Sequence, residues 1–478
     1  MSTTETSKTK KTRVWSQWLA ASTIHLLAIL DGLVCGWVSP YLAKLTAGTE
    51  SLKITNDEAS WIASLSRVSQ LLGSILAAVI VYKIGAKKAV FFAGVPYVIG
   101  WSCFLIQESV LSIYIARIIN GFAIGMFLST FPLYIGEISK PKIRGALISA
   151  IAQGAGIGSL LGNCLGAYLP MTTFAIIGLI MSIVFLLSFY LIPDSSHYLV
   201  KRNKLKEAEK SLKWYNRQKD VGDELGALIA YIGKPQKLSR KEAFKQILIP
   251  LNRKLLIIIL CILVFTNLSG VFVIQMYMEI LLTALKIKII SPSLVVICVG
   301  IVAIISGLLT MYTNDHFGRR TMLAVSALGV SVTFFLIGAK FLLVNRGYDI
   351  SSVQWLIIAE FMIYIFFVNV GIVNIPYCLL SEIFPTEFKE IGASTANVVS
   401  SIAAFVAGKS YQSVLDATSE EFIFFFYGSI LFFMFIYTIL VVPETKGKSL
   451  QEIQNMFTQK NKRMSNSRND SLIATSPR

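Results

Sequence analysis

Twelve apolar segments alternate with polar loops along the chain. They span residues 17–38, 60–81, 89–107, 112–135, 146–169, 171–192, 255–282, 293–313, 321–344, 353–379, 391–411 and 421–442. Nearly all of them exceed the ~17 residues that a helix needs to cross a bilayer. Inside lipid, such a segment satisfies its own backbone hydrogen bonds by forming a helix. The pattern therefore predicts an all-α membrane protein with twelve transmembrane helices.

The largest polar interruption separates six apolar segments from the other six. Within it, Leu205, Ala208, Leu212 and Tyr215 share one stripe of a helix over 199–215, which predicts a surface helix. We therefore expect five parts: a cytoplasmic N-terminal segment (1–16), an N-terminal six-helix bundle (17–192), a cytoplasmic linker with short helices (193–254), a C-terminal six-helix bundle (255–442) and a cytoplasmic C-terminal tail (443–478).

Composition and charge narrow the class of protein. Of the 478 residues, 54% are hydrophobic and 15% are charged, against the roughly 25% charged residues of soluble domains. The net charge is +17, but Lys and Arg concentrate in alternate loops, as they do when they set the orientation of membrane helices. We therefore expect both termini in the cytoplasm and the chain in the plasma membrane, with no nucleic acid as partner.

The sequence contains no recognisable catalytic or metal-binding motif. All six cysteines lie inside apolar segments without the spacing of metal ligands, and the three histidines share no motif. A phosphate-binding loop of the Gly-x-x-x-x-Gly-Lys-Ser/Thr type is also absent from the sequence. We expect a protein that is not an enzyme and uses no cofactor or metal.

The two halves of the chain repeat one another. Glu137 is followed seven residues later by Arg144, and Glu382 is followed seven residues later by Lys389, each time just past a predicted helix end. Such internal repeats are typical of secondary transporters, which bind their substrate between two related bundles.

Several motifs together resemble one family. They are Arg117-x-x-x-Gly121, Pro132-x-Tyr134-x-x-Glu137, Pro193-Asp194-Ser195, Leu268-Ser269-Gly270, Asp315-x-x-Gly318-Arg319-Arg320, Pro376-Tyr377 and Pro443-Glu444-Thr445. In this order the set resembles the sugar porter family of the major facilitator superfamily. Two further motifs, Gly36–Pro40 and Glu58–Ile62, look most like those of insect facilitated trehalose transporters.

The resemblance implies a facilitative sugar transporter, a uniporter working by alternating access on trehalose or another sugar, and functional as a monomer. Two alternatives stay open. The chain could be a proton-coupled sugar symporter, or a sensor that binds sugar without carrying it.

Charged residues at the inner helix ends form a predicted gate. A guanidinium group binds a carboxylate in a fixed two-pronged geometry and can latch two bundles together. By the resemblance, the gate comprises Arg117, Glu137, Arg144, Asp315, Arg319, Glu382, Lys389 and Glu444. Because Lys389 stands where the family usually has arginine, we expect a looser latch on that side.

Neutral polar side chains inside the apolar segments are the candidates for binding a sugar. Amide and hydroxyl groups donate and accept the hydrogen bonds that a sugar's hydroxyl groups need. The candidates are Gln153, Thr266, Asn267, Gln275, Tyr277, Asn369, Asn374, Tyr377, Asn397 and Ser401. Asn267, Tyr377 and Asn397 fall on sugar-contact positions of the family. The alternative is that such groups bond one helix to another.

Some positions depart from the family pattern and leave the sugar open. Thr266 and Asn267 replace the usual pair of glutamines, and Phe272 replaces an asparagine. Gly270, between Thr266 and Tyr277, is expected to leave room for a close ligand.

Two charges lie deep in the first two predicted helices. Val38 occupies the position where proton-coupled relatives carry an aspartate, so downhill transport is the default expectation. Asp31 and Arg67 each lie on the order of 14 Å from the outer helix ends at ~1.5 Å per residue. Because an isolated charge at that depth is costly, we predict that they form an intramembrane ion pair.

Overall fold

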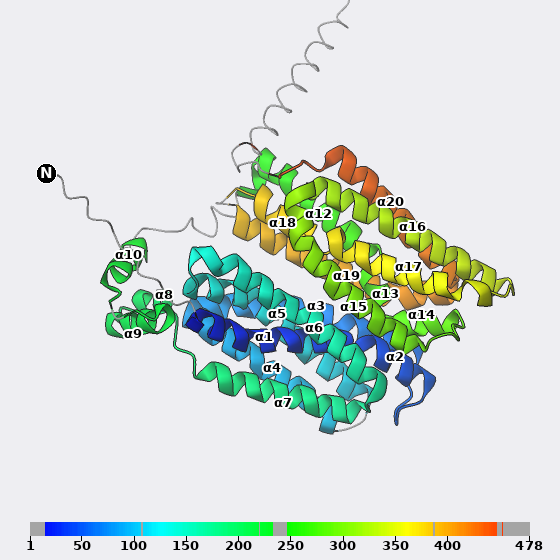
Figure 1. Ribbon diagram of the computed structural model, residues 1–478, viewed down its shortest axis with the longest axis horizontal. Coiled ribbons are helices and arrows are strands. Elements are labelled where there is room, and N and C mark those ends of the chain that lie inside the picture. Colours follow the sequence, from blue (N-terminus) through cyan, green and yellow to red (C-terminus); the bar gives the residue numbers. More distant parts are fainter. Residues whose placement is uncertain are drawn as a thin grey trace, which may run out of the picture. The chain divides into compact units, whose positions relative to one another are not determined.

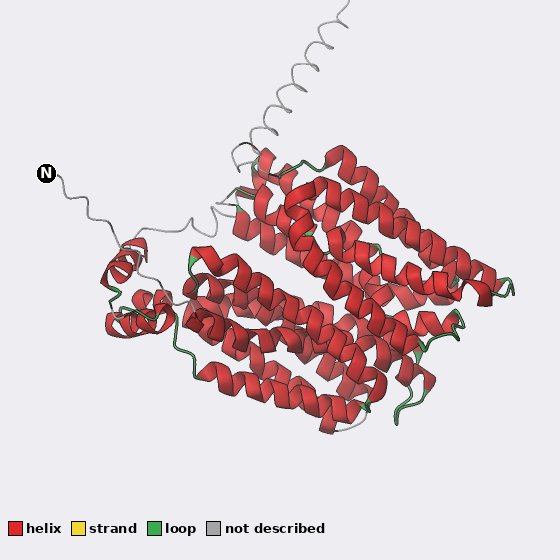
Figure 2. Cartoon of the chain, viewed as in Figure 1, coloured by secondary structure: helices red, strands yellow, loops and turns green. Residues whose placement is uncertain are grey.

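The structure is all-helical throughout its described residues. The computed structural model describes residues 15–106, 109–218, 220–232, 246–385, 388–446 and 452, and Figure 2 shows helices joined by loops in these ranges. Within these ranges, twelve helices are long and apolar enough to cross a membrane, from Trp15–Ala47 to Glu420–Val441. These findings confirm the predicted fold class. The predicted terminal segments lie largely outside the described residues.

The chain forms two compact units. The first comprises Met1–Trp37, Glu50–Leu52 and Val68–Gln236, and the second comprises Val38–Thr49, Lys53–Arg67 and Lys237–Arg478. The division therefore falls at the predicted linker and also inside the first two spans, whose residues 38–49 and 53–67 group with the second unit.

Within the described residues, the first unit contains four complete spans, parts of two others and three short helices (Figure 1). These elements are α1 (Trp15–Gly36), the second part of α3 (Asn56–Ile84), α4 (Ala86–Ile106), α5 (Val110–Ile138), α6 (Pro141–Tyr168), α7 (Met171–Tyr190), α8 (Ser196–Lys201), α9 (Leu205–Asn216) and α10 (Gly222–Ile232).

Helices α1 and α6 approach one another closely because glycines line their contact. A Cβ atom on Gly158 would lie 2.1 Å from the carbonyl oxygen of Ile29, and one on Gly36 would lie 2.2 Å from that of Ser159. Small residues allow membrane helices to pack backbone against backbone. The glycines of this pair therefore serve packing.

The second unit contains the remaining spans, and two of those that lie wholly within it are interrupted in the described residues (Figure 1). Its elements are α2 (Val38–Ala47), the first part of α3, η1 (Gln246–Leu248), α12 (Pro250–Leu268), α13 (Val271–Met276), α14 (Met278–Ala284), α15 (Pro292–Phe317), α16 (Arg319–Asn345), η2 (Ser351–Val353), α17 (Gln354–Phe367), η3 (Val368–Ile372), α18 (Ile375–Ile383), α19 (Lys389–Ala417) and α20 (Glu420–Val441).

The predicted helix over 255–282 is wrong in one respect, because it is broken into α12, α13 and α14. Gly270, between α12 and α13, has φ +70°, which glycine adopts without strain. A Cβ atom here would also lie 2.1 Å from the ring of Tyr427. The space beside Gly270 is thus filled by Tyr427, and the expectation that it leaves room for a ligand is wrong.

The span over 353–379 contains a π-helix, η3, between α17 and α18. A π-helix leaves backbone carbonyl groups without their usual partners and often marks a functional segment. Here the carbonyl oxygen of Asn369 accepts from Thr310 Oγ1 at 3.1 Å and from Asn374 Nδ2 at 2.8 Å. These side chains stabilise the interruption.

The linker helix predicted over 199–215 is also two helices in the structure. The turn between α8 and α9 contains Asn203 at φ +59°, a left-handed conformation that ends α8. Within α9, Ala208 and Tyr215 are buried as the stripe predicts, whereas Leu205 at its start is exposed.

Candidate functional site

Five of the predicted sugar-binding residues of the second unit lie on three helices that contact one another. Helix α12 packs against α18 and α19, and α18 packs against α19. Thr266 and Asn267 lie at the end of α12, Tyr377 lies on α18, and Asn397 lies on α19. Tyr377 and Asn397 are exposed, whereas Thr266 and Asn267 are buried.

Asn267 links two of these helices. Its Nδ2 atom donates to the carbonyl oxygen of Leu263 at 2.8 Å and to the hydroxyl of Ser400 on α19 at 2.9 Å. Ser400 is buried and lies three residues after Asn397 and next to Ser401. Residues three apart on a helix share a face, so Asn397 and Ser400 project from the same side of α19.

Two predicted site residues carry buried hydroxyl groups without a partner. Thr266 Oγ1 and the hydroxyl oxygen of Tyr277 have no hydrogen-bond partner among the described residues. Most hydroxyls in these spans bond to their own helix, as Thr310 does to Ser306 at 2.7 Å. An unpaired buried hydroxyl is unfavourable, and a sugar contact by Thr266 or Tyr277 stays a prediction.

Aromatic rings surround the break between α12 and α14. The rings of Tyr277 and Tyr411 have centroids 4.5 Å apart. Tyr364 donates to the backbone carbonyl of Val271, and the side chain of Gln275 interacts with the same hydroxyl. Gln275 is thus already engaged with α17.

Asn369 and Asn374 bond the backbone around η3. Asn369 Nδ2 donates to the carbonyl of Ile365 at 2.9 Å, and Asn374 Nδ2 donates to the carbonyl of Asn369. Both therefore have a structural use, and a sugar contact by either stays a prediction. Gln153 is half-buried on α6 in the first unit, while Ser401 is half-buried on α19 in the second.

Three residues of the predicted gate come together at one end of the second unit; we call Arg319, Glu382, Glu444 and Thr445 the Glu444 cluster. Arg319 binds Glu382 through NH2 at 2.9 Å and Nε at 3.1 Å, which is the two-pronged donation expected of arginine. Thr445 donates to the other Glu382 oxygen at 2.5 Å.

Glu444 closes the N-terminus of α16. Its two oxygens accept from the backbone N–H groups of Arg319 at 2.9 Å and Arg320 at 3.2 Å. A carboxylate is favourable at a helix N-terminus. Gly318, which precedes α16 at φ +87°, allows this contact because a Cβ atom would lie 2.6 Å from Glu444 Oε2.

Of two gate residues of the first unit, Glu137 bonds to the linker and Arg144 bonds to the turn before its own helix. Glu137 accepts from the hydroxyl of Ser195, whose side chain also caps α8. Arg144 donates to the hydroxyl and the carbonyl of Ser139, each at 3.4 Å. Burial, with a smaller contribution from Arg144, lowers the pKa of His197 on α8.

Further bonds fasten the linker to the start of α1. Gln17 Nε2 donates to Asn216 at 3.2 Å, and Gln17 Oε1 accepts from the backbone of Lys140 at 3.0 Å. The hydroxyls of Tyr134 and Tyr215 lie 2.7 Å apart. A cavity of about 200 Å³ lies between these residues and α10.

Three predicted gate residues do not join a cluster. Arg117 lies twenty residues before Glu137 on α5, about 30 Å away at ~1.5 Å per residue. It donates to the carbonyl of Val34 at 3.0 Å and lies over the Trp37 ring. Lys389 is exposed at the start of α19 without an ion pair among the described residues. The side chain of Asp315 is outside the described part of the structure.

The predicted Asp31–Arg67 pair stays a prediction. Asp31 is buried on α1 in the first unit. Arg67 belongs to the second unit, where its guanidinium lies 5.5 Å from the centre of the Phe272 ring.

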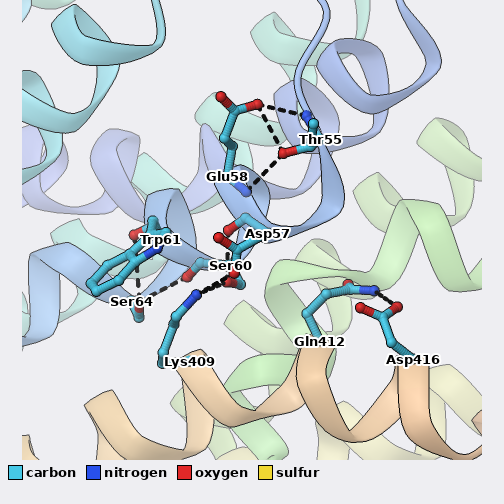
Figure 3. Close-up of polar contacts among 9 residues, drawn as sticks. All are labelled: Thr55, Asp57, Glu58, Ser60, Trp61, Ser64, Lys409, Gln412 and Asp416. Carbon is cyan, nitrogen blue, oxygen red and sulfur yellow. Dashed lines mark hydrogen bonds and ion pairs between the residues drawn. The ribbon is translucent and has the colours of Figure 1, made fainter.

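A charge cluster at the start of α3 was missed from the sequence; we call Asp57, Ser60, Trp61 and Lys409 the Trp61 cluster. Figure 3 shows Lys409 of α19 directed at Asp57 and Ser60. Its ammonium group is 2.9 Å from Ser60 Oγ and 4.4 Å from the centre of the Trp61 ring, and it forms an ion pair with Asp57. Lysine inside an apolar segment was the available signal.

The Trp61 cluster and the Glu444 cluster lie at opposite ends of the second unit. Lys409 is near the end of α19, whereas Glu382 precedes its start. At the end that holds the Trp61 cluster, Thr55 and Glu58 form a reciprocal cap at the start of α3 (Figure 3). Glu58 Oε2 accepts from the Thr55 backbone N–H at 2.7 Å, and Thr55 Oγ1 accepts from the Glu58 backbone N–H at 3.3 Å.

A second missed pair is buried between α16 and α17. Lys340 donates to Glu360 Oε1, while Oε2 of Glu360 has no hydrogen-bond partner in the described ranges. Both side chains are charged residues inside predicted apolar segments, which is the same signal that identified Asp31 and Arg67.

The sequence is similar to those of known transporters. The model of the sugar (and other) transporter family matches residues 18–457. The facilitated trehalose transporter Tret1 of Aedes aegypti is 29% identical over 459 residues, covering 95% of this chain but 56% of that protein. Tret1 of Bombyx mori is also 29% identical, over 96% of this chain and 90% of its own length.

Solved transporters share the fold. The xylose transporter XylE from E. coli, in an inward open conformation, superposes with a TM-score of 0.74 at 19% identity, covering 92% of this chain and 99% of XylE. The POT family transporter PepTSo superposes with a TM-score of 0.65 at 10% identity, covering 90% of this chain and 98% of PepTSo.

Proposed function

This chain belongs to the sugar (and other) transporter family, and from this premise we propose that it moves a sugar across a membrane by facilitated diffusion. The observation that carries the proposal is the neutral polar group around the break after α12. There the buried hydroxyls of Thr266 and Tyr277 lack hydrogen-bond partners among the described residues, and Asn267 directly follows Thr266 in the sequence. Such groups suit the hydroxyls of an uncharged sugar.

Trehalose is the first sugar to test. The curated relatives named above are facilitated trehalose transporters. A disaccharide presents many hydroxyls, and an exposed aromatic side chain such as Tyr377 can lie against the apolar face of one ring.

We propose alternating access as the mechanism, with the two clusters of the second unit acting at opposite ends. The Glu444 cluster would hold the cytoplasmic end and the Trp61 cluster the outer end, with both termini in the cytoplasm of the plasma membrane. In this scheme, transport requires the contacts of each cluster to break in turn, and one chain suffices. Lys389, Glu137 and Arg144 would contribute to the cytoplasmic closure.

Proton coupling is the second candidate function, and buried Asp31 is the observation that favours it. A carboxyl group inside the membrane marks a proton path in many transporters. Asp31 would then exchange a proton during the transport cycle instead of serving only as the partner of Arg67.

The deciding experiment is uptake of radiolabelled trehalose and glucose into proteoliposomes, with and without a pH gradient. Saturable uptake that stops at equal concentrations supports a uniporter. Accumulation against the sugar gradient that requires an inward proton gradient supports a symporter instead. Binding of a sugar without uptake would contradict transport and indicate a sensor.

A further inference from the structure

The side-chain amide of Asn267 is fixed in one orientation by its surroundings. Its Nδ2 atom donates to the Leu263 carbonyl oxygen and to Ser400 Oγ, at 2.8 and 2.9 Å. A backbone carbonyl accepts hydrogen bonds and cannot donate them. The nitrogen of the amide, and not its oxygen, must therefore face Leu263.

Both N–H groups of this amide are in use. An amide nitrogen carries two hydrogens, and Leu263 and Ser400 take one each. Within the described part of the chain, the recorded bonds of Asn267 involve only Nδ2. Oδ1 is left to meet a ligand, so this residue can accept a hydrogen bond but cannot donate one.

Ser400 supplies the second of the two anchors. It is 8% exposed and belongs to α19, whereas Asn267 and Leu263 belong to α12. With the Leu263 bond alone, one N–H group would be released, and the terminal torsion of the side chain, which is broad in asparagine, would be less restricted. The contact between α12 and α19 thus determines that Asn267 faces a ligand as a hydrogen-bond acceptor.

We propose that Ser400 is a positioning residue that holds Asn267 as a hydrogen-bond acceptor, so that the site selects a solute hydroxyl that donates to Asn267 Oδ1. The inference rests on the proposed sugar transport and adds that the substrate group at one position must donate a hydrogen bond. A site built to bond a hydroxyl rejects analogues that lack it. The rejected class includes groups of similar size without a proton, such as fluorine.

The test compares deoxy and deoxyfluoro derivatives as competitors of labelled trehalose or glucose uptake by the wild-type protein. Fluorine fills much of the space of a hydroxyl but cannot donate. At one substrate position, both derivatives should lose affinity equally, by about tenfold, as expected when one hydrogen bond is lost. In Asn267→Ala the loss at that position should disappear, while the losses at other positions remain.

Ser400 variants test the positioning role. Ser400→Ala should weaken binding of the parent sugar about three- to tenfold. It should also narrow the difference in affinity between the hydroxyl and the fluorine compounds at that position, because a released N–H group of Asn267 can face fluorine. Ser400→Thr keeps the hydroxyl and should restore both properties. The matched control is Ser429→Ala, since the Ser429 hydroxyl donates to its own helix at Phe425, 2.8 Å away.

Two results would overturn the inference. One is a deoxyfluoro derivative that binds more tightly than the deoxy derivative at the Asn267-dependent position, because the amide would then be donating. The other is a Ser400→Ala protein with the wild-type analogue profile, a readout that stays available if Asn267→Ala does not fold. Either result leaves uptake of the parent sugar intact, whereas absence of sugar uptake by the wild type would refute the proposed function.

Discussion

The ammonium group of Lys409 lies over the face of the Trp61 ring, 4.4 Å from its centre. The same group bonds Ser60 and pairs with Asp57, whose side chain is 72% exposed. Water screens an exposed ion pair strongly. Water weakens the attraction between a cation and an aromatic ring less than it weakens an exposed ion pair. The Trp61 ring should therefore stabilise the position of Lys409 more than Asp57 does.

Removing Lys409 should loosen the proposed outer closure. Ser64 is buried against Gly408, where an added Cβ atom would lie 3.3 Å from Ser64 Cβ. A cysteine at Ser64 should react with a membrane-impermeant maleimide about two- to tenfold faster in Lys409→Ala, the range of one cation–π contact. Mass spectrometry of the labelled peptide gives the rate.

The control for this experiment is Lys409→Arg, which keeps the cation over the ring. It should leave labelling near the rate of the Ser64→Cys protein alone. Labelling that is equally slow in Lys409→Ala would argue against a closure at the Trp61 cluster.

Gly318 and Gly347 offer a matched pair for the Glu444 cluster. Both have positive φ, +87° and +82°, but a Cβ atom on Gly347 meets nothing within 4 Å, whereas one on Gly318 meets Glu444. Alanine at Gly347 should reduce stability by about 1–2 kcal/mol through the backbone alone. Alanine at Gly318 should cost about 1–3 kcal/mol through the backbone, because its ψ of 156° lies in a region that is essentially restricted to glycine. Gly318→Ala should lose about 1–3 kcal/mol more through the clash.

Thermal unfolding in detergent measures this difference. Equal losses in Gly318→Ala and Gly347→Ala would mean that Glu444 moves away without consequence. In that case its two backbone contacts do not hold α16.

The Lys340–Glu360 pair should be structural. Lys340→Met leaves a buried carboxylate without its cation, which should reduce stability by about 3–5 kcal/mol and lower the amount of folded protein. Lys340→Met combined with Glu360→Leu removes both charges and should recover most of the loss. Fluorescence-detected size-exclusion chromatography measures folded protein, and uptake by the double variant at the wild-type rate would confirm that the pair takes no part in transport.

His197 should make the linker sensitive to acid. Its pKa is lowered in the folded protein by burial and by Arg144, so the unfolded chain binds a proton more readily. The stability from neutral His197 is therefore complete above the usual histidine pKa of about 6.5 and is lost as the pH falls below it.

His197→Asn should flatten the fall in melting temperature between pH 7.5 and pH 5. The control is His316→Asn, the same substitution at an exposed position outside the linker. A steep acid slope that persists in His197→Asn would assign the sensitivity to other groups.

Asp31 and Arg67 remain to be tested as partners. Asp31→Asn should reduce folding or expression, because Arg67 would lose its counter-charge, and Arg67→Gln should partly restore it in the double variant. If Asp31→Asn instead expresses normally but loses uphill, pH-dependent uptake, Asp31 serves proton coupling.

The twelve spans were predictable because lipid forces long apolar segments into helices, whatever the packing around them. The interruptions were not, since they depend on contacts between distant segments. Gly270 needs the Tyr427 ring beside it, and η3 needs Thr310 to bond Asn369. Apolar content alone does not reveal these contacts.

The candidate site was predictable in residue type more than in geometry. Neutral polar residues inside apolar segments pointed to Thr266, Asn267 and Tyr277. Ser400 is not among the candidates that the sequence predicts, because its bond to Asn267 joins residues 133 positions apart. Arg117 shows a different limit of prediction from motifs. It was assigned to the cytoplasmic gate with Glu137, but it lies twenty residues before Glu137 on α5.

The glycine contacts between α1 and α6 leave no room for a single methyl group, since carbonyl oxygens occupy the places where side chains would begin. The two helices should therefore move as one rigid body during the transport cycle. Any bending must then occur in neighbouring helices that are less tightly packed. Substitutions at this contact between α1 and α6 are therefore poor choices for changing the transport rate, because any side chain larger than hydrogen would force the two helices apart.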